Sequence, residues 1–139
     1  MFSKEEEQQI VAAIQAAESK TSGEIVLHLE KSCSSDPIER ARYWFQKLNL
    51  QQTELRNGVL ILLIEKQQRF AIYGDQGIHE HVAQKFWDEQ SLLLAGDLRH
   101  GRKVEGLVAL IGRVGEQLGQ YFPHTNVDKN ELSNDVSYS

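Results

Sequence analysis

Asn57-Gly58-Val59-Leu60-Ile61-Leu62-Leu63-Ile64-Glu65 is the stretch that decides the fold of this chain. Its uninterrupted branched aliphatic residues have no polar face, which is typical of a short strand covered on both sides. The Asn57-Gly58 pair before it indicates a turn, because both residue types tolerate a positive φ. After a short connection, Arg69 to Tyr73 places Phe70 and Ile72 on one face, which predicts an antiparallel partner strand. The stretch therefore predicts the centre of a sheet.

The residues before this stretch predict two helices and a strand. Ser3 and Glu6 have the spacing of a capping box, and apolar residues then recur at helical spacing, which predicts a helix over about 4–20. Glu24–Glu30 alternates in the period-2 pattern of a strand with one better-buried face. Asp36-Pro37 begins a second helix, over about 37–48. Because a helix joins the strands 24–30 and 59–64, these should be parallel, and the sheet should be mixed.

The residues after the hairpin predict two further helices, over about 83–98 and 103–122. The second has the strongest apolar period in the chain although it contains four glycines, which suggests that close packing, for example onto the sheet, offsets their cost. Residues 124–139 are polar and have no periodicity, which predicts a disordered tail. The sequence thus predicts one α/β domain over residues 1–123.

Composition narrows the class of protein. A chain of 139 residues with 40% hydrophobic residues fits a single globular domain. The net charge of -5, without a basic run, argues against nucleic-acid binding. No apolar run approaches the roughly 20 residues that cross a bilayer, so no membrane insertion is expected. The acidic first helix does not resemble a signal peptide, so the chain as written is expected to be soluble and cytoplasmic; a signal or anchor removed from the sequence would make it periplasmic.

Asp75 is the first candidate metal ligand. It lies in Gly74-Asp75-Gln76-Gly77, at the carboxyl end of a predicted strand, where side chains from neighbouring loops can converge. Oxygen ligands on a flexible glycine-rich loop suit Ca²⁺ or Mg²⁺. The alternative is that the Asp75 carboxylate only makes an Asx-type turn with its own backbone.

Three other acids are candidate helper ligands. Asp88 and Glu89 follow Phe86-Trp87, and Glu24 opens the first strand. Paired acids near a metal can also activate water, whereas the plain alternative is a solvated helix face. His79 and His81 are too few ligands for a zinc site, and no Ser/His/Asp order is recognisable.

Several short stretches together resemble the TPM domain family over about residues 2–123. They are Thr21-Ser22-Gly23-Glu24-Ile25-Val26, Asn57-Gly58-Val59-Leu60-Ile61, Ala71-Ile72-Tyr73-Gly74-Asp75-Gln76-Gly77-Ile78, Phe86-Trp87-Asp88 and Tyr121-Phe122-Pro123. The resemblance implies a three-layer α/β/α sandwich with a mixed central sheet, as in bacterial exported or membrane-anchored proteins and a thylakoid-lumen protein linked to photosystem II repair. It also implies a site in the loops at one end of the sheet, including Asp75. Acid phosphatase activity and binding of divalent cations, calcium in particular, are associated with relatives.

The chain departs from the family pattern at two places. Arg56 stands where members often have Asp, and Gly-Asp-Gln-Gly-Ile-His stands where they often have Gly-Tyr-Gly-Leu-Glu-Gly. Fewer carboxylates weaken metal binding and metal-assisted hydrolysis. Three hypotheses follow: an accessory or interaction domain that binds a divalent cation, a weak metal-dependent phosphatase, and a metal-free docking module for a protein or membrane-complex component.

Overall fold

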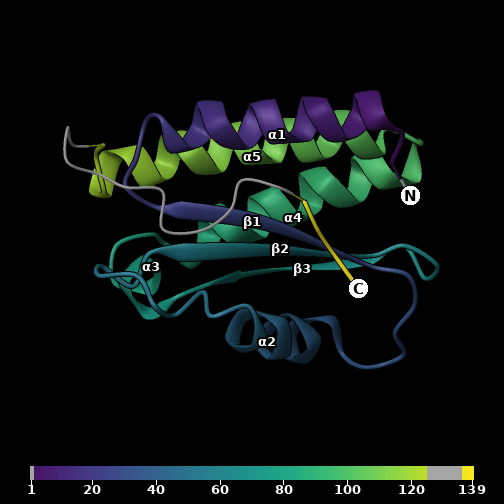
Figure 1. Ribbon diagram of the computed structural model, residues 1–139, viewed down its shortest axis with the longest axis horizontal. Coiled ribbons are helices and arrows are strands. Elements are labelled where there is room, and N and C mark those ends of the chain that lie inside the picture. The colour runs from purple at the N-terminus through teal and green to yellow at the C-terminus, as the bar shows by residue number, and fades with distance from the viewer. Residues whose placement is uncertain (1, 125–135) are drawn as a thin grey trace.

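The computed structural model describes residues 2–124 and 136–139 as three layers of helix, sheet and helix (Figure 1). The elements are α1 (Lys4–Glu18), β1 (Glu24–Glu30), α2 (Pro37–Lys47), β2 (Gly58–Ile64), β3 (Arg69–Gly74), α3 (Gln76–His79), α4 (Gln84–Arg99), α5 (Lys103–Tyr121) and β4 (Ser137–Tyr138). The predicted α/β/α sandwich is confirmed. The predicted helices and strands lie within about two residues of these bounds.

The sheet has the order β3-β2-β1-β4 and is mixed, as expected. β1 is parallel to β2, with Ile25 opposite Val59, and β2 is antiparallel to β3, with Ile61 opposite Ile72. All seven residues of β2 are buried. The quoted stretch is therefore a central strand.

Two cores lie on the two faces of the sheet, because successive side chains of a strand point to opposite faces. Val59, Ile61 and Leu63 belong to the larger core, under α1, α4 and α5. Leu60, Leu62 and Ile64 belong to the smaller core, over α2. Burying each such side chain contributes about 1.5–3 kcal/mol.

The expectation that β1 has one better-buried face is wrong, since all seven of its residues are buried. Alternate side chains of β1 point to the two buried faces of the sheet. The face that carries the polar residues is buried because α2 covers it. On this face the Glu30 carboxylate accepts hydrogen bonds from Arg40 Nε, at 2.8 and 3.1 Å, from Arg40 Nη2 at 2.5 Å and from Trp44 Nε1 at 3.3 Å. Paired polar groups can be buried at little cost.

α1 and α5 lie side by side across the larger core (Figure 1). The capping box of α1 is present, with the Glu6 amide 3.1 Å from Ser3 Oγ. Gly115 of α5 allows close packing on α1 rather than on the sheet, because a Cβ there would lie 2.5 Å from Ala17 Cβ. The expected close packing is therefore present at Gly115 with α1, and at Gly106 with Asp97 of α4, whereas Gly112 meets nothing within 4 Å.

Three further local features differ from the expectations. The residue with positive φ before β2 is Arg56 (φ 50°), not Asn57 or Gly58. The short α3 follows β3 directly. The predicted disordered tail is wrong for Ser137–Tyr138, which form β4 by pairing with β1 at the sheet edge; residues 125–135 lie outside the described part of the chain.

Candidate functional site

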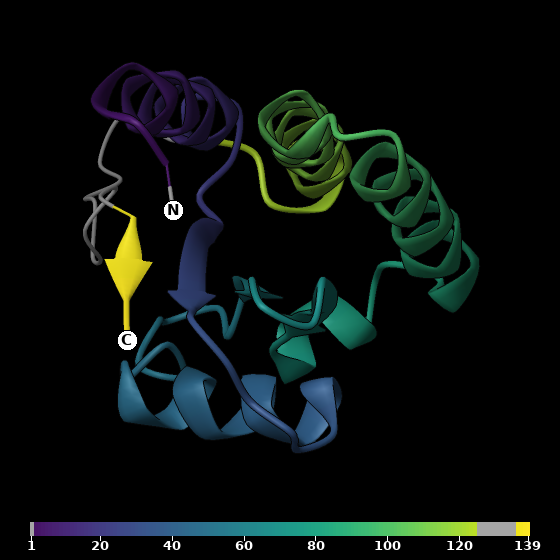
Figure 2. The same cartoon turned by 90° about the vertical axis from the view of Figure 1, so that its right-hand side faces the viewer.

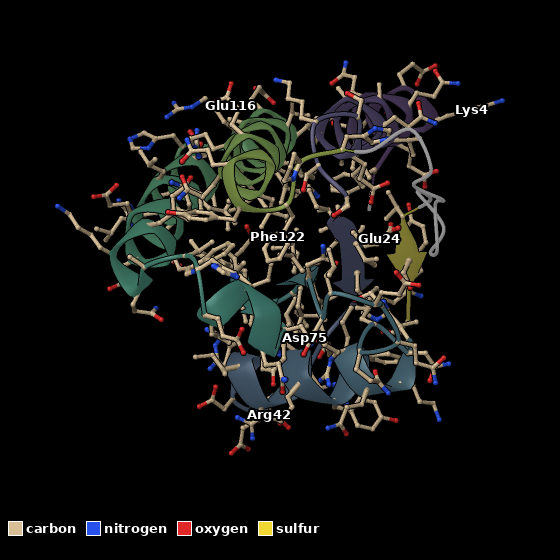
Figure 3. The ribbon with its side chains drawn as sticks, turned by 90° about the vertical axis from the view of Figure 1, so that its left-hand side faces the viewer. Lys4, Glu24, Arg42, Asp75, Glu116 and Phe122 are labelled. Atoms are coloured by element: carbon tan, nitrogen blue, oxygen red, sulfur yellow. The ribbon has the colours of Figure 1, made fainter. Side chains whose placement is uncertain are left out.

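One end of the sheet gathers acidic side chains from different elements. β1 and β2 begin there and β3 ends there, because β3 is antiparallel to the other two. Glu24 opens β1, and Asp75 follows β3 (Figure 3). We call the group Glu18, Glu24 and Asp75 the acidic end of the sheet. Two of the four predicted ligands, Glu24 and Asp75, thus reach the same end.

Asp75 is held by Arg56. Arg56 Nε lies 2.7 Å from Asp75 Oδ2 and its Nη2 lies 2.8 Å from Oδ1, so the guanidinium takes both oxygens. Oδ1 also accepts the Gln76 amide at 2.8 Å and so caps the first turn of α3. The carboxylate is buried, and its charge is already compensated. The turn-bond alternative for Asp75 is therefore part of what the structure shows, together with an ion pair.

The backbone around Arg56 is unusual and tightly held. Its φ of 50° lies in the left-handed region, which a bulky residue rarely adopts. Its carbonyl accepts the Gly77 amide at 2.9 Å. A Cβ at Gly77 would lie 2.2 Å from the Leu55 carbonyl oxygen, so only glycine permits this approach. Arg56 and Asp75 are positioned by backbone contacts on both sides.

Glu18 and Glu24 form a carboxyl pair. Glu18, at the last turn of α1, accepts the Ile25 amide through Oε2 at 2.9 Å and is hydrogen-bonded to the Glu24 side chain. Burial raises the pKa of Glu18 to about 8, with a further contribution from the negative charge of Glu24, although the Ile25 hydrogen bond acts against it. The pair therefore holds a proton at neutral pH.

Polar contacts fix the loop that carries this pair. Thr21 Oγ1 donates to the Phe122 carbonyl and accepts the Gly23 amide at 3.0 Å. The Ser22 amide also donates to the Phe122 carbonyl, at 2.9 Å. The Asn57 side-chain amide donates to Ser22 Oγ at 3.3 Å, and the Asn57 backbone amide donates to Thr53 Oγ1 at 3.2 Å. Phe122, the residue after α5, thus anchors the loop at the acidic end; Figure 3 labels Phe122, Glu24 and Asp75.

The proton on Glu18 makes stability depend on pH. The folded pKa of about 8 exceeds the ordinary 4.5, so the native state keeps a proton that the unfolded state loses between these values. This contribution is complete below about pH 4.5 and is lost as pH rises through 8. We expect Glu18→Gln, which stays neutral and can still accept the Ile25 amide, to match the wild type at pH 5 and to melt about 3–6 °C higher at pH 8.5.

Thermal unfolding followed by circular dichroism at the two pH values measures this effect. Glu39→Gln is the matched control, because Glu39 is exposed in the first turn of α2. The control should leave the difference between the two melting temperatures unchanged. Equal shifts for both variants would refute the assignment to Glu18.

Asp88 and Glu89 are not gathered with Asp75 into one cluster. Both are exposed on α4, and Asp88 accepts a hydrogen bond from Gln84 at 3.1 Å. His81 stacks on Tyr121, with ring centroids 5.6 Å apart. Within residues 2–124 and 136–139, no three His, Cys, Asp or Glu side chains lie close enough together to hold a metal ion. As metal ligands, Asp75, Asp88, Glu89 and Glu24 stay predictions.

Glu18 and the pairing role of Arg56 are missing from the sequence-based site. An acid in the last turn of a helix opposes the helix dipole, and this was the available signal for Glu18. A short loop then joins that helix to the strand that Glu24 opens. For Arg56, the sequence shows only that a cation stands where relatives often have an acid.

Exposed large hydrophobic side chains are spread over several elements. They include Ile38 and Tyr43 on α2 and Leu92 and Leu93 on α4.

No helix among the described residues has the length and apolar character needed to cross a bilayer.

The described features define a three-layer α/β/α domain with an acidic end of the sheet at which an arginine compensates one carboxylate. Comparison with known proteins gives the family. The TPM domain model matches residues 1–117, and the chain belongs to the TPM domain family. A search of curated proteins finds no match.

Solved structures agree with this assignment. The BA42 protein from the psychrophilic bacterium Bizionia argentinensis is 40% identical, with a TM-score of 0.93 over 100% of this chain and 96% of that chain. The N-terminal domain of a P. gingivalis protein has a TM-score of 0.74 at 16% identity, covering 90% of this chain and 82% of that chain. The N-terminal domain of the Corynebacterium glutamicum protein cg2496 has a TM-score of 0.66 at 14% identity, covering 100% and 80%. The last two show the fold alone.

Proposed function

We propose that this TPM domain is an accessory domain that binds a divalent cation at the acidic end of its sheet without turning over a substrate. The observation that carries the proposal is the Glu18–Glu24 carboxyl pair, which holds a proton at neutral pH. Two close carboxyls that cannot both ionise mark a place where a cation can replace the proton. Calcium or magnesium would be the ligand, because both prefer oxygen donors.

The chain's own residues fit such an ion unequally. Glu18 and Glu24 supply two carboxyls, and Mg²⁺ is commonly held by one or two carboxylates and several waters. Asp75 fits poorly, since Arg56 occupies both of its oxygens. We therefore assign the ion to Glu18 and Glu24. Asp75 could become a ligand only if the Arg56 guanidinium moved off its carboxylate. The result is a weak site.

Hydrolysis has less support than binding. The family pattern that implies phosphatase activity often has acids where this chain has Arg56 and Ile78. The Arg56 guanidinium also removes Asp75 from the groups that could orient water. Exchange of a proton for a cation needs none of these groups.

Proton release tests the proposal. Calcium chloride or magnesium chloride is titrated into weakly buffered protein at pH 7, with a pH indicator and with amide NMR. Because Glu18 must lose its proton to bind the ion, we expect nearly one proton released per bound cation and amide shifts clustered at Glu18, Glu24 and Asn57. Glu18→Gln should abolish the release, and Glu39→Gln should preserve it.

Four outcomes would refute parts of this proposal. Amide shifts scattered over the surface, or cation binding without proton release, would remove the Glu18–Glu24 site. Hydrolysis of p-nitrophenyl phosphate that disappears in Asp75→Ala and in chelator would favour the phosphatase. A silent titration with both salts would favour the metal-free docking module.

A further inference from the structure

The edge of β1 at the far end of the sheet is closed by the chain's own β4 (Figure 2). β4 runs parallel to β1, with Ser137 opposite His28 and Tyr138 opposite Leu29. The Ser139 amide donates to the Leu29 carbonyl at 3.0 Å. Nearer the other end of β1, the Glu18 carboxyl accepts the Ile25 amide. The edge of β1 around His28 and Leu29 is thus a place where an extended peptide adds to the sheet, and β4 is such a segment.

β4 is recognised through alternate side chains. Ser137 and Ser139 point to the α2 side, where His28 Nδ1 lies 2.8 Å from Ser137 Oγ and Nε2 lies 2.8 Å from Ser139 Oγ. Burial lowers the pKa of His28 to about 4, so its neutral ring donates to one serine and accepts from the other. The His28 imidazole therefore forms hydrogen bonds with hydroxyl groups at two positions of the segment, Ser137 and Ser139.

The other face of the segment contacts the α1 side. The Tyr138 hydroxyl donates to the Glu7 carboxylate of α1. Val136 is partly buried against the larger core. The pattern that fits the β1 edge is therefore an apolar residue followed by serine, an aromatic residue and serine. Backbone hydrogen bonds supply affinity in this mode of binding, and the alternate side chains supply specificity.

Neighbouring side chains hold the His28 ring in place for these hydrogen bonds. His28 packs on Trp44, with ring centroids 4.2 Å apart, and Arg40 lies over the same indole. Arg40 is in turn paired with Glu30, whose carboxylate lies 3.4 Å from Ser139 Oγ. Hydrogen bonding to Arg40 lowers the pKa of Glu30, so the carboxylate stays charged. The imidazole is thereby fixed before the peptide arrives.

The pairing of β4 with β1 is short enough for β4 to be replaced by another strand. Only two residue pairs join β4 to β1, and Tyr138 is 41% exposed. A cleft of about 340 Å³, bordered by Leu29, Glu30 and Lys31, opens beside Ser139. We propose that the β1 edge is a strand-binding site for a Ser-aromatic-Ser peptide. The peptide that binds there is residues 136–139 of a second copy of this chain, which replace the first copy's own β4.

Mixed labelling tests the exchange with the unmodified chain. Isotope-labelled and unlabelled proteins are mixed at about millimolar concentration and incubated. We expect intermolecular NOEs between the His28 ring of the labelled chain and the Ser139 side chain of the unlabelled chain, together with a dimer by light scattering. NOEs confined to single chains, with a monomer at this concentration, would overturn the proposal.

A synthetic peptide tests recognition separately. An acetylated peptide of residues 132–139 is titrated into the Ser137→Ala/Ser139→Ala variant, whose own segment lacks both hydroxyls. We expect binding about tenfold tighter than to wild type, with shifts at His28 and Leu29, and about tenfold weaker binding of the same peptide with both serines as alanine. Ser34→Ala/Ser35→Ala is the matched control, because these serines are exposed before α2. Equal binding by all proteins, or shifts elsewhere, would overturn the assignment.

Discussion

An Arg56→Asp variant is expected to melt about 5–10 °C lower than the wild type in chelator and to regain most of this loss in calcium. The substitution replaces the cation that holds the buried Asp75 with a second carboxylate. Two like charges at this distance repel, and a divalent cation neutralises both.

The backbone does not oppose this substitution. Arg56 is left-handed, with a φ of 50°, and Asp is among the residues that adopt this conformation more readily than most. The loss of stability in chelator is therefore assigned to charge. Differential scanning calorimetry in EDTA and in calcium measures both melting temperatures.

Arg42→Asp makes the same change of charge on the exposed face of α2 and serves as the matched control (Figure 3). It should leave the melting temperature nearly unchanged and independent of calcium, since exposed charges contribute little. If Arg56→Asp also melts at the same temperature in EDTA and calcium, the Arg56–Asp75 pair has no bearing on a cation site.

Gly77→Ala is expected to destabilise the domain by about 3 kcal/mol, at the upper end of the range for overpacking. The new Cβ would lie 2.2 Å from the Leu55 carbonyl oxygen and 2.7 Å from that of Arg56. Both obstacles are backbone atoms, so no rotation of a side chain relieves the contact. The loop must move away from α3, and the Arg56–Asp75 ion pair must loosen with it.

Urea unfolding followed by tryptophan fluorescence gives the free energy of unfolding. Gly112→Ala is the matched control, because a Cβ there meets nothing within 4 Å and lies on the exposed side of α5. It should stabilise the domain by about 0.5–1 kcal/mol through helix propensity. Similar free energies for Gly77→Ala and the wild type would show that the loop accommodates the methyl group.

The sequence predicts most of the fold because apolar periodicity determines it. The aliphatic run at Val59–Ile64 predicts a doubly covered strand, and both cores pack on it. α3 and β4 escape this reasoning because four and two residues are too few to show a period. β4 depends on hydroxyl contacts with His28, which is 109 residues from Ser137 in the chain.

The candidate site is predictable in place but not in pairing. The carboxyl end of β3 and the start of β1 bring Asp75 and Glu24 to one end of the sheet, as strand directions require. The partners of these acids depend on side-chain contacts that the sequence pattern does not reveal. Arg56 forms an ion pair with Asp75, and Glu18 is hydrogen-bonded to Glu24. Asp88 and Glu89 follow two aromatic residues in the sequence, and both are exposed on α4.

α1 and α5 can pack together only after residues 103–121 have left the ribosome. β1, α2, β2 and β3 come from one continuous stretch, 24–74, and can associate early through contacts that are short in sequence. During this interval Ile25, Leu27 and Ile61 face water on the side that the two helices later cover. The nascent domain is therefore open to aggregation on one face until its last helix arrives.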